Sequence, residues 1–268
     1  MKNLKKLPLI LSILSLASFI TPVNADVKVV ASIKPLHSLA SYLMDGVGKP
    51  DLIVEGYGSP HGFSMKPSHA KILQNADLIF WVGEDLEIFL EKPLSSIAKK
   101  AEKIELMEIK GLNVLKFRER NIFDKHDHDD HDDHGKKEDD HDDHEHDDHD
   151  KKEEHADHDD HDGHEGHAHG EYDPHIWLDP MNAKVILNEM VEHLIENDAK
   201  NASKYKSNLK NAFKDIDKLT ADVKADLSKS TASIVFHDAY QYFEERFDIN
   251  ILGAFTVNTD VMPGAEQL

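Results

Sequence analysis

The sequence contains 20 histidines and no cysteine, so any metal site in it must use nitrogen and oxygen ligands. Fourteen of the histidines lie in one tract, from His126 to His169. Neutral imidazole favours zinc, copper or nickel over the metal ions that prefer carboxylates. The six histidines outside the tract are His37, His61, His69, His175, His193 and His237.

We expect three of these six histidines to lie in loops or at strand ends, next to predicted strands and helices. His61 lies in "YGSPHGFSMKPS", after a predicted strand, and His237 ends the apolar run "SIVFH". His175 lies in "DPHIWLDP", where Pro174 and Pro180 restrict the backbone. Loops beyond the carboxyl ends of strands are where α/β proteins bind ligands. Three histidines in such loops suit a tetrahedral zinc site with one further position.

The other three histidines are expected to have structural roles. His37 lies within a predicted helix and His69 near the start of another. His193 lies in the middle of a helix beside Glu192 and Glu196, on a face that we expect to be solvated. None of the three lies on an exposed strand-end loop, so none is taken as a ligand.

The elements that must position the candidate ligands alternate along the chain. Predicted strands cover residues 27–32, 51–55, 77–83, 103–109, 232–238 and 249–257. Predicted helices cover 35–47, 66–76, 86–100 (broken or kinked at Pro93), 181–197, 203–228 and 239–247. Short apolar strands alternating with helices predict an α/β fold with small, mostly parallel sheets covered on both faces.

The acidity of the chain belongs to one segment. The net charge is −21, but residues 124–173 hold 24 of the 52 acidic residues and only five of the 31 basic ones. The remaining chain, with 28 acids and 26 bases, is nearly neutral. Neither part carries the basic patch that nucleic-acid binding requires.

Residues 124–171 form the predicted insertion, whose composition is almost entirely histidine and charged residues. Such a segment buries too little apolar area to offset the entropy of ordering it, so we expect it to be disordered. Its histidines can bind several zinc ions, each with a shifting set of ligands and hence more weakly than a folded site. We interpret the tract as an accessory zinc reservoir.

The first 25 residues are typical of a cleaved secretory signal peptide. Lys2, Lys5 and Lys6 precede an apolar run at 7–20, and "VNA" ending at Ala25 supplies small residues for cleavage. A membrane anchor is the alternative, but the run falls short of the roughly 20 apolar residues that a span needs. The sequence therefore predicts an exported, periplasmic protein that does not span the membrane.

Several motifs together resemble one family. "SIKPLHSLA", "GSPHGFSMKPS", "DLIFWVG", "YDPHIWLDP", "FHDAYQYFEERF" and "VNTDVMPGAEQL" are similar to segments of the periplasmic zinc-binding proteins of ABC-type high-affinity zinc uptake systems. The resemblance runs from about residue 27 to 268 and includes a His-rich insertion before "DPH". It implies that His61, His175 and His237 are the metal ligands. Related manganese-binding members carry a carboxylate at the third position, so His237 argues for zinc.

The resemblance also implies an organisation and a set of partners. We expect an N-terminal lobe over 26–202, a linking helix over 203–229, and the start of an incomplete C-terminal lobe over 230–268. His61 and His175 would belong to the first lobe and His237 to the second. Zinc would be the transported ligand rather than a catalytic cofactor, and a monomeric protein would deliver it to the membrane permease of an ABC transporter.

The sequence does not identify the fourth ligand of the predicted zinc site. Some family members have a glutamate directly before the first ligand, where this chain has Pro60, which cannot coordinate a metal. Water, an acid beyond Leu268 or a residue of the insertion are the remaining choices.

Two other functions compete with transport. Three histidines and an open position also describe the zinc site of a hydrolase. The sequence has neither an H-E-x-x-H helix nor a G-x-S-x-G motif, so we do not expect an enzyme. A periplasmic metal buffer or adhesion protein without a transporter is the second alternative.

Overall fold

The computed structural model describes residues 27–118, 170–227 and 232–256. The predicted signal peptide (1–25), nearly all of the predicted insertion (124–171) and the segment that follows residue 256 lie outside the described residues.

Four parallel strands form the first sheet. Their order is β2 (Asp51–Leu52), β1 (Val29–Ala31), β3 (Leu78–Trp81) and β4 (Glu102–Glu105). Every residue of β1 and β3 is buried, as expected for the central strands of a parallel sheet. All four strands are shorter than their apolar runs suggested. In particular, β4 gives way to a 3₁₀ turn at Leu106–Glu108.

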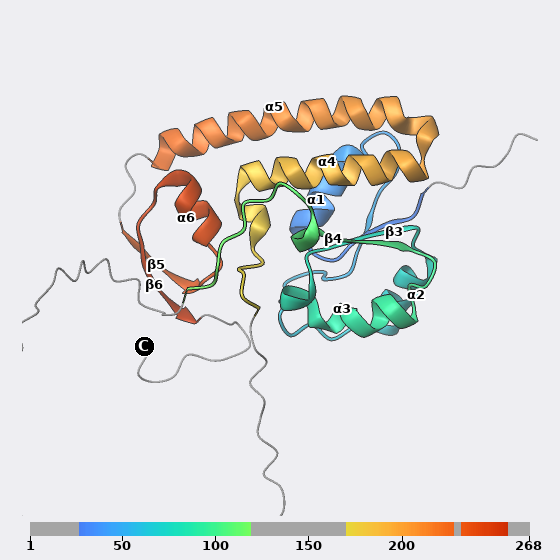
Figure 1. The fold of residues 1–268 in the computed structure, drawn as a ribbon, viewed down its shortest axis with the longest axis horizontal. Helices are drawn as coiled ribbons and strands as arrows, with labels where there is room; N and C mark the ends of the chain where they lie inside the picture. The colour runs from blue at the N-terminus through green and yellow to red at the C-terminus, as the bar shows by residue number, and fades with distance from the viewer. Residues whose placement is uncertain (1–26, 119–169, 228–231, 257–268) are drawn as a thin grey trace, which may run out of the picture.

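Helices cover both faces of this sheet. They are α1 (Lys34–Leu43), α2 (Pro67–Asn75), α3 (Glu84–Ser96), α4 (Pro180–Asn197) and α5 (Ala202–Leu227). Val29 and Ala31 belong to a core cluster with buried residues of α1, α4 and α5, whereas Val30 belongs to a second cluster with residues of α2 and α3. Alternate side chains of one strand thus enter the two cores, and α2 and α3 lie on the opposite side of the sheet from α4 (Figure 1).

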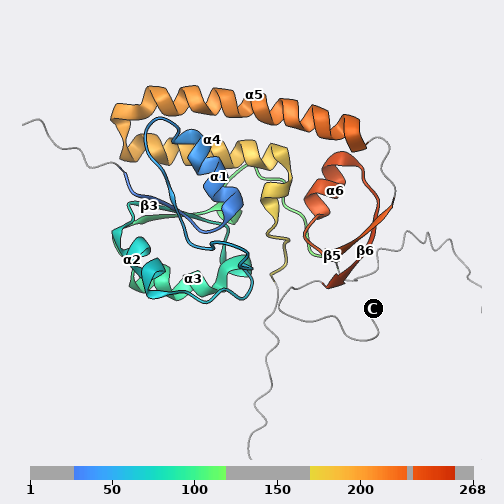
Figure 2. The same cartoon turned by 180° about the vertical axis from the view of Figure 1, so that it is seen from behind.

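A second, smaller sheet lies beyond the first. It consists of β5 (Ser233–His237) and β6 (Ile251–Thr256), which are parallel, with the short helix α6 (Gln241–Phe247) between them in the chain. Small parallel sheets with packed helices confirm the predicted α/β class. The helix α5 runs alongside α4 and continues to the second sheet, as both ribbon views show (Figures 1 and 2).

The first half of α5 is fastened to the elements around the first sheet. Asn208 Nδ2 donates hydrogen bonds to the carbonyl oxygens of Leu43 (2.7 Å) and Asp45 (2.9 Å) at the end of α1. The buried Tyr205 hydroxyl donates to Asp198 Oδ2 at 2.8 Å. With 26 residues, α5 is about 39 Å long, enough to pass the first sheet and lead to β5. The domain boundaries inferred from the sequence stay predictions.

A break or kink was expected at Pro93, and the break is wrong, because α3 continues through this residue to Ser96. The helix deviates instead at Glu87, whose φ of −127° and ψ of 47° are not helical. Glu87 Oε2 accepts hydrogen bonds from the amides of Val82 (2.7 Å) and Gly83 (3.3 Å). The side chain thereby satisfies donors at the helix start, which explains why the irregularity lies there.

Glu87 is fully buried, and burial raises the pKa of its carboxyl from the ordinary 4.5 to about 7, although these amides and the Ser32 hydroxyl lower it. The folded protein therefore holds a proton that the unfolded chain releases between these two pH values. Stability should decrease as the pH rises through this window, by about 3 kcal/mol in total.

Glu87→Gln, which mimics the protonated carboxyl, should raise the free energy of unfolding at pH 8 by about 2–3 kcal/mol and have little effect at pH 4.5. Denaturant unfolding followed by circular dichroism at both pH values measures this. Glu91→Gln, on the exposed face of the same helix, is the matched control. Equal effects of Glu87→Gln at the two pH values would contradict the prediction.

Candidate metal centre

The three candidate ligands converge in space. Ring centroids lie 5.6 Å apart for His61 and His175, 5.0 Å for His61 and His237, and 5.0 Å for His175 and His237. One nitrogen of each ring lies within 4.8 Å of those of the other two. The Nε2 atoms of His175 and His237 are 3.2 Å apart. Two nitrogen ligands of one tetrahedral zinc ion are separated by about 3.3 Å, so the pair already has the required spacing.

Each ring reaches the centre from a different segment. His61 follows β2 in the loop that leads to α2, and its ring is partly exposed. His175 is only 4% exposed and directly precedes the 3₁₀ turn Ile176–Leu178, which leads into α4. His237 is the last residue of β5, at its carboxyl end. The centre therefore lies where the segments around the two sheets meet.

Asp173 orients the ring of His175. Its Oδ1 atom accepts hydrogen bonds from the backbone N–H of His175 at 2.9 Å and from Nδ1 at 2.6 Å. Both residues are buried, with Asp173 only 1% exposed. A proton on Nδ1 leaves the Nε2 lone pair directed at His237 and His61. A carboxylate behind a ligating histidine in this way is a common support of metal sites.

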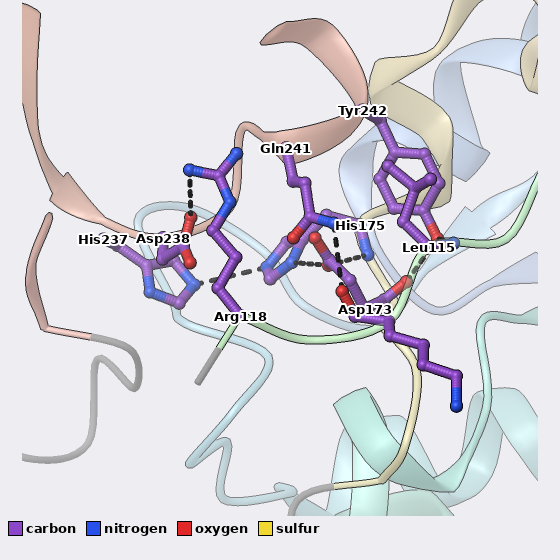
Figure 3. A network of polar contacts seen from close by, with 9 residues as sticks. Leu115, Arg118, Asp173, His175, His237, Asp238, Gln241 and Tyr242 are labelled. Atoms are coloured by element: carbon purple, nitrogen blue, oxygen red, sulfur yellow. Dashed lines mark hydrogen bonds and ion pairs between the residues drawn. The ribbon is translucent and has the colours of Figure 1, made fainter. Parts of the chain in front are cut away.

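Tyr242 of α6 holds the segment that carries Asp173 and His175. Its hydroxyl donates to the carbonyl oxygen of Asp173 at 2.6 Å and accepts from the backbone N–H of Leu115 at 3.1 Å (Figure 3). The N–H of Asp173 in turn donates to the carbonyl of Leu115 at 2.8 Å. A residue beside the second sheet thus positions a loop next to the first.

The ends of the predicted insertion are joined close to this point. Lys116 and Tyr172 form an antiparallel β-bridge, and the N–H of Phe117 donates to the carbonyl of Glu171 at 3.2 Å. We call residues 115–117 and 171–173 the neck. The neck ends two residues before His175, so the described residues on the two sides of the insertion meet beside the candidate centre.

A second contact between α6 and α4 lies at Asp179. Its carboxylate caps α4 by accepting from the N–H of Met181 at 2.8 Å, and it forms a bidentate ion pair with Arg246 of α6 at 2.7 and 2.6 Å. Asp179 is only 1% exposed. Because a buried carboxylate left without its partner is costly, this pair keeps α6 against the start of α4.

Charged groups lie close to the residue that follows His237. Asp238, the next residue, is buried, and burial raises the pKa of its carboxyl while the nearby Arg118 guanidinium lowers it. Arg118 lies 3.9 Å from Asp238 and donates a hydrogen bond to Glu244 of α6 (Figure 3 shows Arg118 and Asp238). Together with Asp173, the carboxylates in this region outnumber the single guanidinium of Arg118. The local charge therefore favours the binding of a cation.

Of the remaining histidines, two have the structural contacts expected of them. His69 is buried, and its Nδ1 accepts a hydrogen bond from the N–H of Lys66 at 3.1 Å, which caps α2. His37 Nε2 lies 3.1 Å from the carbonyl oxygen of Pro50. His193 differs from the expectation of a solvated face, because its side chain is only 20% exposed and faces carboxylates.

The sequence analysis did not identify Asp173, Tyr242 or Arg246. Asp173 stands two residues before His175, and a carboxylate at that spacing was a readable signal. The other two act on segments 67 or more residues away, which no local pattern reveals.

Comparison with known proteins places the chain in a family. Residues 29–268 match the model of ZnuA, described as zinc-uptake complex component A, periplasmic. The chain belongs to this family. The resemblance inferred from the motifs is thereby confirmed, and the ZnuA family is one of transport components that take up zinc.

Individual relatives agree with this membership. A "High-affinity zinc uptake system protein ZnuA" of Brucella abortus (strain 2308) is 49% identical over 242 residues, which cover 90% of this chain and 70% of that protein. The protein of the same name from Haemophilus influenzae (strain ATCC 51907 / DSM 11121 / KW20 / Rd) is 41% identical over 272 residues, covering 100% of this chain and 79% of the relative.

Solved structures share the ZnuA fold with this chain. A crystal structure of ZnuA superposes with a TM-score of 0.65 at 18% identity and covers 91% of this chain and 75% of that one. A manganese-bound periplasmic metal-binding protein from Candidatus Liberibacter asiaticus gives a TM-score of 0.63 at 17% identity, covering 90% and 72%. Among the described residues of our chain, no helix combines the length and the apolar composition needed to cross a bilayer.

Tyr242→Phe should lower the free energy of unfolding by about 1–3 kcal/mol, because the partly buried Leu115 N–H loses its partner and the buried Asp173 carbonyl loses one. Denaturant unfolding monitored by circular dichroism gives the value. Tyr240→Phe, on the exposed tyrosine two residues earlier, is the matched control and should change stability by less. Equal, small effects of the two substitutions would show that the Tyr242 hydroxyl does not hold the neck.

Proposed function

We propose that this chain binds zinc in the periplasm as the substrate-binding component of an ABC-type zinc uptake system, with His61, His175 and His237 as ligands. The observation that carries the proposal is the convergence of three imidazoles, two of whose Nε2 atoms are 3.2 Å apart. The curated relatives named for high-affinity zinc uptake support zinc as the ion.

The chemistry of the ligand set agrees with zinc. Three neutral imidazoles suit zinc, copper or nickel better than manganese, magnesium or calcium. Within the described residues, no acidic side chain joins the three histidines as a fourth ligand of the same cluster. A water molecule, or a residue outside the described ranges, completes the tetrahedron.

The placement of the ligands suits capture and release. His61 extends from the segment after the first sheet, and His237 ends a strand of the second. An ion bound by both therefore adds a link between the parts of the protein that carry the two sheets. Delivery to a membrane permease separates this function from that of a metal buffer or adhesion protein, neither of which would bind a permease in the zinc-loaded form. We expect the protein to act as a monomer.

Catalysis is the less favoured function. Glu244 and Glu245, the first two glutamates after His237 in the chain, are occupied: Glu244 pairs with Arg118, and Glu245 Oε1 accepts from Asn113 Nδ2 at 3.4 Å. Neither is presented as a general base, and the family is one of transport components. A folded, zinc-loaded protein that hydrolyses no ester or peptide substrate is the expected result.

The combined substitution His61→Ala, His175→Ala, His237→Ala should abolish the tight zinc site. The test is a titration against a chromophoric chelator in a variant that lacks residues 124–169, so that the tract does not contribute and the neck remains. One tight equivalent is expected before the substitutions and none after them, with circular dichroism confirming the fold. The control is His37→Ala, which should keep the tight site. Retention of the tight site in the triple variant would refute the assignment of these ligands.

We propose further that the His-rich insertion acts as a zinc reservoir. The neck brings the residues on the two sides of the insertion together near His175, and histidines tethered there would have a high effective concentration near the centre. Coordination requires neutral imidazole, and the 24 acidic residues in and beside the insertion favour its protonated form.

Deleting residues 124–169 should lower the number of zinc ions bound and leave the affinity of the tightest one unchanged. Equilibrium dialysis with metal analysis measures the first quantity, and chelator competition measures the second. Loss of the tightest site from a folded deletion variant would show that the insertion supplies an indispensable ligand.

A further inference from the structure

A second set of metal-ligand atoms lies away from the three histidines. Glu102 begins β4, and His193 and Glu196 lie in the last two turns of α4. One ligand atom of each lies within 4.8 Å of the other two. His193 and Glu196 are three residues apart on a helix and hence share a face. The fold brings Glu102 to this face from 91 residues earlier in the chain.

The contact between Glu102 and His193 is close but is not a hydrogen bond. Glu102 Oε1 lies 2.7 Å from His193 Nδ1, and Glu196 Oε2 lies 3.9 Å from the same nitrogen. Nδ1 is nevertheless a buried atom without a hydrogen-bond partner: the Glu196 oxygen is too far away, and the Glu102 contact is an ion pair only when the ring is protonated. Three potential ligand atoms therefore surround one point while the buried nitrogen is unsatisfied, an arrangement that an ion between them would relieve.

The remaining polar atoms of two of these side chains already have partners. His193 Nε2 lies 3.2 Å from Glu189 Oε1, one turn earlier on α4. Asn197 Nδ2 donates to Glu102 Oε2 at 2.9 Å and to the carbonyl oxygen of His193 at 3.0 Å. With Nε2–H directed to Glu189, the lone pair of Nδ1 is left for a metal. Carboxylate and amide partners of this kind orient the ligands of metal sites.

We propose that Glu102, His193 and Glu196 form a second binding site for a divalent transition-metal ion such as Zn²⁺. One imidazole and two carboxylates, with water in the fourth position, are a ligand set that zinc accepts. Because Glu196 is 70% exposed and Glu102 40% exposed, the site is open to solvent and weaker than the centre with three histidines. An ion bound there would connect the start of β4 to the end of α4.

The two sites are far apart, so either can be tested without the other. Thirteen residues of α4 separate Pro180, near the first centre, from His193, a distance of about 20 Å along the helix. The first centre lies beyond the carboxyl ends of strands, whereas Glu102 marks the amino end of β4. Absence of zinc at the second site would therefore leave the proposed transport function unaffected.

The test is a zinc titration of the full-length chain observed at the imidazole nitrogens by long-range ¹H–¹⁵N NMR, continued until zinc exceeds all 20 histidines. Comparison with His193→Gln assigns the Nδ1 signal of His193. We expect this signal to move to the position of a metal-bound nitrogen. Zn²⁺ bound only at the three-histidine centre and the tract would leave it unmoved, and the proposal would then be wrong.

Two variants of the same helix separate a metal site from a network of ion pairs. Glu189→Gln, which weakens the support of Nε2, should raise the zinc concentration for half-saturation of His193 about tenfold. Glu192→Gln, a neighbouring exposed acid outside the cluster, should leave it unchanged and thus controls for net charge. Equal effects of the two substitutions would mean that zinc responds only to the general field of the helix, which would overturn the assignment of these ligands.

Discussion

The buried carboxylate of Asp179 connects the parts of this protein that build the candidate metal centre. Asp179 lies between His175 and α4, and its carboxylate caps the first turn of α4. The same carboxylate accepts hydrogen bonds from the guanidinium of Arg246 in α6. Removing Arg246 would leave the Asp179 carboxylate without compensation in the interior, so the three elements are held as one unit. Tyr242, one turn earlier on α6, then reaches the neck from a fixed position.

The centre is therefore not divided evenly between the two sheets. His237 ends β5, and His175, although it precedes α4 and packs near the first sheet, is supported from α6 through Tyr242 and Asp173. The Nε2 atoms of these two rings are 3.2 Å apart, while His61 reaches them from a separate loop after β2. The sequence expectation, which grouped His61 and His175 in one lobe, overlooked this support because it comes from residues more than 60 positions away.

Local patterns predicted the order and type of the elements and the three converging histidines, since strand ends and prolines are readable in the sequence. They failed where a distant contact decides the outcome. Pro93 did not break α3, because the local irregularity is set by Glu87 folding back onto the amides of Val82 and Gly83. His193 was expected in solvent, and only the packing of α4 against the start of β4 places Glu102 beside it.

The neck has a consequence for how this chain can vary. Its backbone pairing, through the bridge between Lys116 and Tyr172, sets the separation of the two ends whatever lies between them. For a flexible loop with fixed ends, doubling the length changes the closure free energy by only about 0.6 kcal/mol. Histidines can therefore be gained or lost by simple repeat expansion or contraction without moving His175. With the proposed reservoir, the number of zinc ions bound would then change with the insertion, while the affinity of the three-histidine centre would not.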